Sequence, residues 1–273
     1  MAGGNFGPFH LQNRTAWDRL VSQKSRFAKA ADDDELINPL KTVDGKLGWL
    51  SKGVQGQNLL CLAAGGGRQS ALYAAAGAKV TVVDISPKML ELDREVARER
   101  KLNIKTIEAS MDDLRMIADQ IFDIVIQPVS TCYVPAIIPV FKEVARVLKS
   151  SGIYISQHKS PANLQSDVEN KKGGYRIREK YYQPNTSPLP GVSGSRLRED
   201  QTAEFIHRWE EIIGGMCRAG FLIEDLVEPN HARAGANDGE FGHRCQYIAP
   251  YVRIKAIRKS AQGSTSTSLL LPE

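Results

Sequence analysis

The sequence predicts an α/β protein, a three-layer sandwich in which helices cover both faces of a seven-stranded, mostly parallel sheet. Three observations support this prediction. Short apolar runs alternate with helix-prone segments, a glycine-rich corner joins a buried strand to a helix, and two strand-like segments close the chain. Alternating strands and helices are typical of parallel sheets, because a crossover helix usually joins two parallel strands.

Residues 58–87 are the segment around which the rest of the chain is organised. Residues 59–62 form a continuous apolar run, as expected for a strand buried on both faces. Residues 63–67 (AAGGG) then remove side chains where the backbone must turn sharply and approach a ligand. After a helix-prone segment comes a β-branched run, 79–83, with Asp84 at its carboxyl end. Parallel sheets bind ligands at that end, and a carboxylate there can accept both ribose hydroxyl protons, so this unit predicts a site for an adenosine-containing cofactor.

The pattern of this corner distinguishes between cofactors. Ser70 stands where a dinucleotide fingerprint has its third glycine, and no Lys-Ser or Lys-Thr follows as in a P-loop. The corner resembles that of class I S-adenosylmethionine (SAM)-dependent methyltransferases, in which one strand ends in G-x-G and the next in an acidic residue. Residues 65–67 match the first motif and Asp84 the second. Cys61 replaces an acidic residue that the family often carries in the first strand, and Ala63 replaces its first glycine.

The resemblance implies S-adenosyl-L-methionine as cofactor, S-adenosyl-L-homocysteine (SAH) as its product, and a Rossmann-like sheet with an antiparallel final strand. It places Gly65 and Gly67 against the amino-acid part of SAM and Asp84 on the ribose. Ile85 is expected on the adenine, and Gln127 beside the methyl-donor end. The implied cofactor-binding residues are Ala63, Gly65, Gly67, Asp84, Ile85, Ser110, Met111 and Gln127.

The third and fourth strands carry further features of the resembled family. Family members often place an acidic residue near the adenine amino group after strand 104–109. Ser110 stands there in this chain, with Asp112 or the backbone as the alternative. After strand 122–126 the sequence is QPVS (127–130), whereas enzymes that methylate nucleic-acid amino groups usually have [DNS]-P-P-[YF]. This difference argues against adenine N6 as the acceptor.

Periodicity and turn residues set the predicted elements. Residue 250 is a proline that interrupts the last strand, and the two final strands are expected to pair as an antiparallel hairpin. Strands are predicted at 59–62, 79–83, 104–109, 122–126, 153–156, 221–227 and 244–257, and helices at 13–30, 68–76, 86–100, 141–149 and 205–219.

The chain divides into a core and several additions. Residues 1–50 are predicted to form an N-terminal helical lid, and residues 51–258 a methyltransferase domain. An irregular stretch at about 159–204 interrupts that domain and is predicted to be a substrate lid, since long excursions are more often functional than idle. Within it, residues 175–182 (YRIREKYY) alternate as a hairpin does, although the aromatic and basic residues are also suited to stacking on a nucleobase. Residues 259–273 are predicted to be a disordered tail.

Composition limits the class of protein. The chain has 273 residues, 42% hydrophobic and 25% charged, with a net charge of +5, which leaves nucleic acid open as a substrate without favouring it. Its four cysteines are scattered, so neither a zinc site nor a disulfide framework is predicted and a cytoplasmic location fits. No apolar run approaches the roughly 20 residues of a membrane helix, and the start lacks the regions of a signal peptide.

Residues 31–35 (ADDDE) form an acidic run. No spaced ligand loop follows them, so the run is interpreted as a solvated helix end or loop and no metal site is predicted.

The acceptor side is predicted from polar residues beyond the strands. His158 follows the fifth strand and is the candidate general base, because histidine titrates near neutral pH. Tyr133, after the fourth strand, is the candidate for orienting the acceptor, and His207 and His243 are weaker candidates. Trp17 and Trp49 are candidate lid or wall residues of the substrate pocket, although hydrophobic packing is the better explanation for each. The predicted activity is methyl transfer to an O, N or S atom of a small molecule, in a pocket covered by residues 1–50 and 159–204.

Three other classes remain open at this level. An RNA or protein methyltransferase would use the basic residues near 171–180, 196–198 and 253–258 for phosphate contacts. An NAD-dependent oxidoreductase is disfavoured by the missing third glycine. A SAM-binding protein that transfers no methyl group would explain why Cys61, Ala63 and Ser110 depart from the usual pattern.

Overall fold

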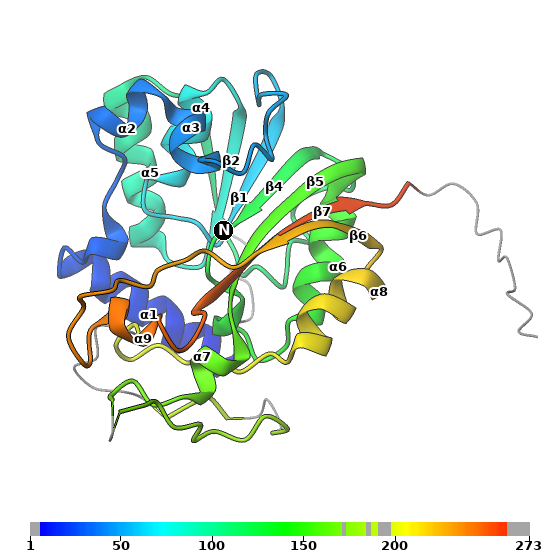
Figure 1. Cartoon of the computed structure of the whole chain (residues 1–273). Coiled ribbons are helices and arrows are strands. Elements are labelled where there is room, and N and C mark those ends of the chain that lie inside the picture. The colour runs from blue at the N-terminus through cyan, green and yellow to red at the C-terminus, as the bar shows by residue number, and fades with distance from the viewer. Residues whose placement is uncertain (1–5, 171–172, 184–186, 191–197, 261–273) are drawn as a thin grey trace, which may run out of the picture.

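The fold was analysed on a computed structural model, which describes residues 6–170, 173–183, 187–190 and 198–260. Seven strands form one sheet in the order β3-β2-β1-β4-β5-β7-β6 (Figure 1). The strands are β1 (Asn58–Leu62), β2 (Lys79–Asp84), β3 (Ile104–Glu108), β4 (Phe122–Gln127), β5 (Leu148–Lys159), β6 (Phe221–Val227) and β7 (Tyr251–Arg258). The first five are parallel, and the predicted sheet is confirmed.

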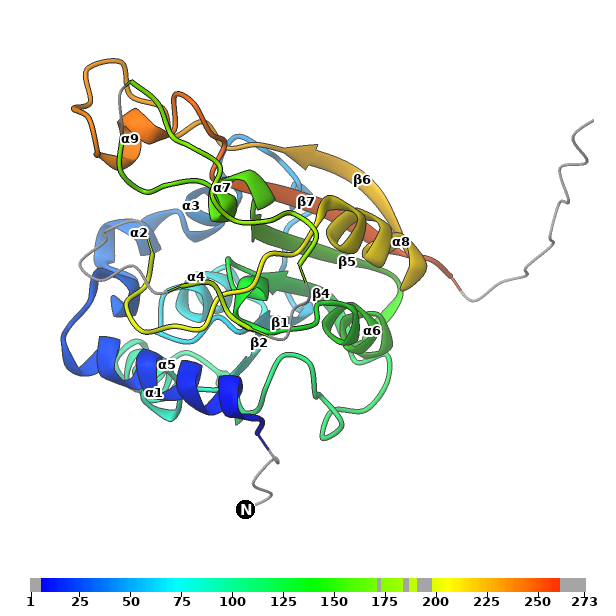
Figure 2. The same ribbon diagram turned by 90° about the horizontal axis from the view of Figure 1, so that it is seen from below.

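Helices cover the two faces of the sheet, as Figure 2 shows. One face carries α4 and α5, with α3 packed on α4, while α6 and α8 cover the other. The helices are α1 (Pro8–Ser22), α2 (Asp33–Ile37), α3 (Pro39–Asp44), α4 (Gln69–Ala75), α5 (Pro87–Arg100), α6 (Ile138–Val147), α7 (Pro161–Gln165), α8 (Gly215–Arg218) and α9 (Phe241–Arg244). Short helical turns lie at η1 (Arg26–Ala28), η2 (Thr131–Tyr133) and η3 (Glu210–Gly214).

The C-terminal strand lies inside the sheet. β7 pairs antiparallel with β5 on one side and with β6 on the other. The predicted antiparallel end of the sheet is therefore confirmed, but its start is corrected. Residues 241–244 form helix α9, and the strand begins only at Tyr251. Pro250 explains the boundary, because proline has no N–H to donate to a strand ladder.

Three other element predictions are corrected. The first helix runs from Pro8 to Ser22, and the chain leaves it at Lys24, which has a positive φ of 52°. The helix predicted from 205 begins only at η3, which is a short π-helix that continues into α8. Residues 175–182 form no hairpin, because their only bridge in the described chain joins Ile177 to Ser166. The predicted tail lies almost wholly outside the described residues, which end at 260.

The acidic run begins α2. Asp32 caps this helix by accepting a hydrogen bond from the Glu35 backbone N–H at 3.1 Å. Glu35 returns a side-chain contact to the Asp32 N–H at 3.3 Å, which completes a capping box.

The largest of four hydrophobic clusters in the described residues lies between the sheet and helices α6 and α8. Phe141 and Tyr154 are fully buried there, and their rings meet edge to face with centroids 6.3 Å apart. Gly215 allows α8 to approach α6 closely, since a Cβ at this position would lie 2.6 Å from Ile138 Cδ1. None of the helices in the described part of the chain is both long and apolar enough to cross a membrane.

Replacing Phe141 by alanine should therefore destabilise the protein by about 3 to 5 kcal/mol, because the ring is fully buried and its removal leaves a cavity. Chemical denaturation of the purified protein measures this change. Leu222→Ala is the control, since that side chain is 56% exposed and its loss should cost less than about 0.5 kcal/mol. Equal effects of the two substitutions would contradict the assignment of this core.

Candidate active site

The glycine turn connects β1 to α4 through unusual backbone conformations. Ala63 has φ 47°, in the left-handed region that normally favours glycine. Its N–H donates to the Val83 carbonyl at 2.7 Å, which extends the pairing of β1 and β2 into the turn. Gly66 and Gly67 also have positive φ, at 111° and 77°. The turn thus keeps its shape although alanine stands where the resembled family has a glycine.

Asp84 links this turn to the end of β2. Its Oδ2 accepts a hydrogen bond from the Gly65 N–H at 2.9 Å, and its Oδ1 accepts one from the Ser86 N–H at 2.9 Å. Burial raises the pKa of Asp84, and the backbone hydrogen bonds from Ser86 and Gly65 oppose that rise. The Ile85 N–H is a third backbone donor to this carboxylate. Since a carboxylate has about four acceptor positions, Asp84 can still accept a hydroxyl proton.

The first turn of α5 connects the site to the N-terminal helix. Ser86 caps α5 by accepting a hydrogen bond from the Met89 N–H at 3.1 Å, and Pro87 begins the helix. The Ser86 hydroxyl also donates to Asp18 of α1 at 2.6 Å. This bond holds α1 beside the end of β2.

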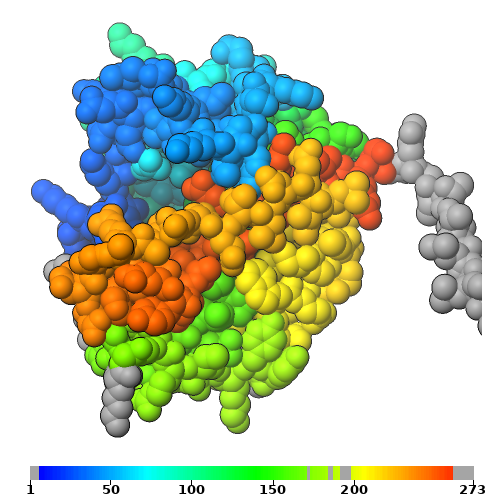
Figure 3. Space-filling model, viewed as in Figure 1, coloured from blue at the N-terminus to red at the C-terminus, as the bar shows by residue number. Residues whose placement is uncertain are grey.

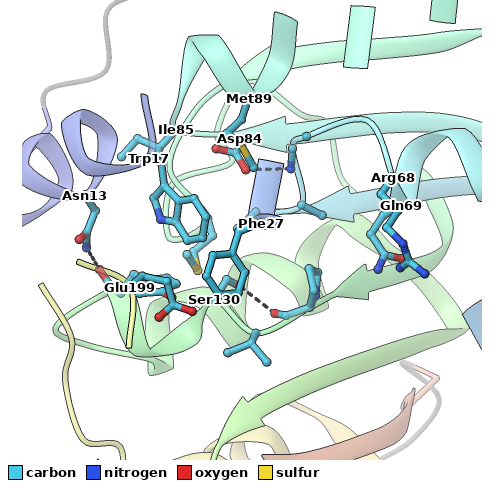
Figure 4. A pocket seen from close by; sticks show the side chains of 18 of the residues that line it. Asn13, Trp17, Phe27, Arg68, Gln69, Asp84, Ile85, Met89, Ser130 and Glu199 are labelled. Carbon is cyan, nitrogen blue, oxygen red and sulfur yellow. Dashed lines mark hydrogen bonds between the residues drawn. The ribbon is translucent and has the colours of Figure 1, made fainter. Parts of the chain in front are cut away.

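A cavity of about 400 Å³ lies over the carboxyl ends of β1, β2 and β4. The surface is hollowed between the blue N-terminal segment and the orange C-terminal segment in Figure 3. Within the cavity, Trp17 and Phe27 face the Asp84 carboxylate region from the N-terminal segment, and Glu199 lies at the other end (Figure 4). The volume falls in the range of ordinary ligand pockets.

Five of the eight predicted cofactor residues line this cavity, and three do not. The five are Ala63, Gly65, Asp84, Ile85 and Met111. Gly67 faces away, since a Cβ on it would lie 3.0 Å from the Leu92 carbonyl oxygen. Gln127 lies underneath, where its amide donates to Ser130 Oγ at 3.0 Å and its Oε1 accepts the Tyr154 hydroxyl proton.

Ser110, the third residue outside the lining, donates its hydroxyl proton to Asp112. Asp112 in turn lies 3.0 Å from His10 Nε2 of α1. The hydrogen bond with Asp112 raises the pKa of His10. This pair therefore links the loop after β3 to the N-terminal helix.

The structure argues against His158 as the general base. It is 1% exposed and does not line the cavity. Its Nδ1 lies 2.8 Å from the Thr131 hydroxyl and its Nε2 2.8 Å from the Ser156 hydroxyl. Burial, with a smaller contribution from His207, lowers its pKa to about 3. Neighbouring residues of a strand point to opposite faces, and it is Gln157 that faces the cavity.

The two weaker histidine candidates also lie away from the cavity. His207 Nε2 is 2.9 Å from the Thr131 carbonyl oxygen and 3.0 Å from that of Val134, so it serves the backbone around η2. His243 Nε2 lies 2.9 Å from Asp238. Trp49 is buried on the α3 side, with its indole N–H donating to Asp225 at 2.8 Å.

Tyr133, in contrast, lines the cavity, and a buried charge network surrounds it. Trp17 meets its ring edge to face, with centroids 5.6 Å apart. Its hydroxyl is hydrogen-bonded to Glu199, and burial holds the Tyr133 pKa well above its usual value. Lys159 Nζ lies 2.7 Å from Glu199 Oε2 and also pairs with the fully buried Glu204.

Glu199 remains ionised in this network. Burial alone would raise its pKa, but the Lys159 ammonium and the hydrogen bonds from Lys159 and Tyr133 hold the pKa below its usual value. Since Glu199 also lines the cavity, one negative charge faces the space beyond Tyr133.

Several cavity residues had no predicted role, because a place in a predicted helix or strand, or in an irregular stretch, does not show which side chains reach the cavity. Their polar or aromatic character was the only signal in the sequence. These residues are Asn13, Arg26, Phe27, Lys29, Arg68, Gln69, Ser130, Gln157, Glu199 and Tyr251.

SAM fits the residues present. The turn at Gly65 has no room for a side chain, since a Cβ there would lie 2.8 Å from Met89 Cβ and 3.0 Å from Asp84 Oδ2. Asp84 lines the cavity with a carboxylate that can accept a ribose hydroxyl proton, and the apolar Ile85 beside it offers a surface for a base. The fold and this cavity define a class I SAM-dependent methyltransferase.

Comparison with known proteins agrees. A family model described as a methyltransferase domain matches residues 60–156. The chain is 36% identical over 230 residues to "Uncharacterized methyltransferase YbaJ" of Bacillus subtilis (strain 168), covering 79% of this chain and 89% of that protein. The chain therefore belongs to the class I SAM-dependent methyltransferase family, and its cofactor is SAM.

Solved structures share the fold at low sequence identity. Geranyl diphosphate C-methyltransferase from Streptomyces coelicolor A3(2), in complex with SAH, has a TM-score of 0.62 at 16% identity, covering 93% of this chain and 100% of that one. Magnesium protoporphyrin IX methyltransferase from Synechocystis PCC 6803, with bound SAM, has a TM-score of 0.58 at 15% identity, covering 94% and 100%.

Gly65→Ala should weaken SAH binding at least about tenfold, because the new methyl group would force either Met89 or the Asp84 carboxylate out of place. Isothermal titration calorimetry with SAH measures the change. Gly235→Ala is the matched control, since a Cβ at that position would meet no atom within 4 Å. Unchanged affinity in the Gly65 variant would contradict the placement of SAM on this turn.

Proposed function

We propose that this methyltransferase transfers the methyl group of SAM to an O, N or S atom of a small-molecule acceptor. The observation behind the proposal is the lining of the cavity, in which Trp17, Tyr133, Glu199 and Tyr251 stand beside the residues of the glycine turn. Aromatic walls with one buried carboxylate suit a small molecule that brings a proton-bearing hydroxyl, amine or thiol.

We also propose that residues 1–50 and the segment 159–204 act together as the cover of this pocket. Asn13 supports this proposal, because it holds both parts. Its side-chain amide donates to the Tyr133 carbonyl at 2.8 Å and the Ala203 carbonyl at 3.1 Å. Its oxygen accepts the Ala203 N–H at 2.7 Å.

The basic residues favour a small acceptor over RNA. Arg176 and Arg178 approach Asp167 at 3.6 and 3.3 Å, and Lys255 pairs with Glu224 at 2.7 Å. These described cations therefore have carboxylate partners within the protein, which weakens the case that they form a phosphate-binding surface. Residues 171–172 and 196–197 of the proposed basic patches lie outside the described residues.

In the proposed reaction, SAM supplies an electrophilic methyl group on a positively charged sulfur. The protein contributes mainly by positioning the acceptor and excluding water, since charge disappears during the transfer. Met111, Pro128 and Ser130 line the cavity near the end of β4, and Gln127 fixes Ser130 from below. An acceptor that must lose a proton needs a base, and Glu199 is the ionised group that faces this space.

Glu199→Gln should therefore lower kcat by about 10² to 10⁴, the usual contribution of a general base, while the Kd for SAH stays within threefold. Lys159 keeps Glu204 as its partner in this variant, so the fold should survive. Steady-state assays of SAH release and calorimetry measure the two quantities. Glu95→Gln, on the exposed face of α5, is the control. Full turnover by Glu199→Gln would remove Glu199 as the base.

The acceptor class itself is tested by SAH release from SAM in the presence of small phenols, amines, thiols and carboxylic acids, compared with transfer RNA and a protein mixture. We expect release with a small molecule and no salt-dependent RNA binding. Methylation of RNA, with affinity falling steeply as salt rises, would replace the proposal by the RNA-modifying alternative. SAH binding with no methylation of any acceptor would favour the SAM-binding protein without transfer.

A further inference from the structure

Asp93 of α5 is a fully buried carboxylate outside the cavity. Its Oδ2 accepts a hydrogen bond from the Gly66 N–H at 3.0 Å, and its Oδ1 accepts one from the Gly67 N–H at 3.1 Å. The Ser70 hydroxyl, at the start of α4, also donates to Oδ1. No Lys, Arg or His of the described chain forms an ion pair with Asp93. Three donors from one turn therefore compensate this buried charge.

Placing a carboxylate here is costly, which argues that it has a purpose. Burial raises the pKa of Asp93 to about 7, and the nearby Asp84 adds to that rise, while the bonds from Ser70, Gly66 and Gly67 oppose it. A neutral side chain of similar size would avoid the cost of burying a charge. Only a side chain with acceptor oxygens at this position can accept hydrogen bonds from the Gly66 and Gly67 N–H groups.

The turn needs such partners because its own sequence does not fix its shape. Three consecutive glycines have many accessible backbone conformations, and ordering them costs more entropy than ordering other residues. The Gly65 N–H is held by Asp84, and the Gly67 N–H by Asp93. The Gly66 N–H is shared between Asp93 and the Met89 carbonyl at 3.1 Å. Two carboxylates on opposite sides thus fix the floor of the cofactor cavity.

Cys61 occupies a position in β1 that bears on the role of Asp93. It is fully buried in β1, just before the turn, where the resembled family often has an acidic residue. Burial and the charge of Asp93 raise the pKa of the Cys61 thiol, so the two side chains lie close enough to interact electrostatically. A thiol is a poor acceptor for amide protons. A second carboxylate at 61 would repel the one at 93.

We propose that Asp93 is a positioning residue for SAM. From helix α5 it holds the Gly66–Gly67 backbone, and it takes the place of a carboxylate in strand β1. The residue acts through the turn and does not touch the cofactor. The proposal concerns the cofactor site alone, so it stands or falls independently of the acceptor.

The test is SAH binding by calorimetry, with thermal unfolding of the ligand-free protein measured in parallel. Asp93→Ala should raise the Kd for SAH at least tenfold, and Asp93→Asn, which keeps one acceptor oxygen, should raise it less. Amide exchange at Gly66 and Gly67 should become faster in Asp93→Ala. Glu99→Ala, on the exposed face of the same helix, should change neither quantity.

A rescue variant tests whether the carboxylate at position 93 replaces one at position 61. Cys61→Asp combined with Asp93→Ala should bring the Kd back to within threefold of the original value, whereas Cys61→Asp alone should weaken binding. Unchanged Kd in both Asp93 variants, even with a lower melting temperature, would reduce Asp93 to a packing residue and overturn the proposal. If Asp93→Ala does not fold, the Asp93→Asn and rescue variants decide. If binding weakens in the Asp93 variants and the double variant does not restore it, the proposal that Asp93 takes the place of a carboxylate in β1 is wrong.

Discussion

The cofactor site depends on the hydrogen bonding of three consecutive backbone N–H groups. Gly65, Gly66 and Gly67 present their amides to Asp84 on one side and Asp93 on the other. Glycine permits the positive φ values and the close approach of a ligand, but it brings no stiffness of its own. Rigidity comes from neighbouring elements, and the two carboxylates supply it from β2 and α5. The same bonds give two buried carboxyl groups their hydrogen-bond partners.

The acceptor side is assembled differently, from segments distant in sequence. Asn13 joins α1 to η2 and to the backbone at Ala203, and Tyr133 packs between Trp17 and the Lys159–Glu199 pair. Strand β5 contributes Lys159, and the irregular chain after it contributes Glu199 and Glu204, which both pair with this lysine. These ion pairs fasten that part of the chain to the sheet, and Glu199 sets the charge of the pocket wall.

Much of the fold could be predicted from the sequence because its signals are local. The apolar run before the turn, the turn itself and Asp84 lie within one short unit, and parallel strands bring their carboxyl ends together. Asp93 also left a local signal that the prediction missed. It stands four residues after Met89 and three before Val96, on the buried face of α5, and a charged residue on an apolar helix face calls for a partner.

Other features could not be predicted, for physical reasons. The prediction for His158 placed it correctly at the end of a strand, but which face a strand residue points to depends on register, and Gln157 faces the cavity instead. Glu199 and Phe27 reach the cavity only through tertiary packing of irregular segments, which no periodicity reveals. Residues 175–182 alternate as a hairpin would, yet the Tyr175 ring packs against His243 of α9, with ring centroids 5.9 Å apart.

The position of β7 has a consequence for how the molecule is made. Because this strand lies between β5 and β6, strand β6 has no place in the sheet until residues 251–258 have left the ribosome. A nascent chain that has emerged only as far as β6 therefore leaves the edge of β5 bare, ready to pair with any extended peptide. Tyr251, the first residue of β7, is also a wall of the cavity. The pocket is therefore complete only after β7 has emerged and has covered the edge of β5.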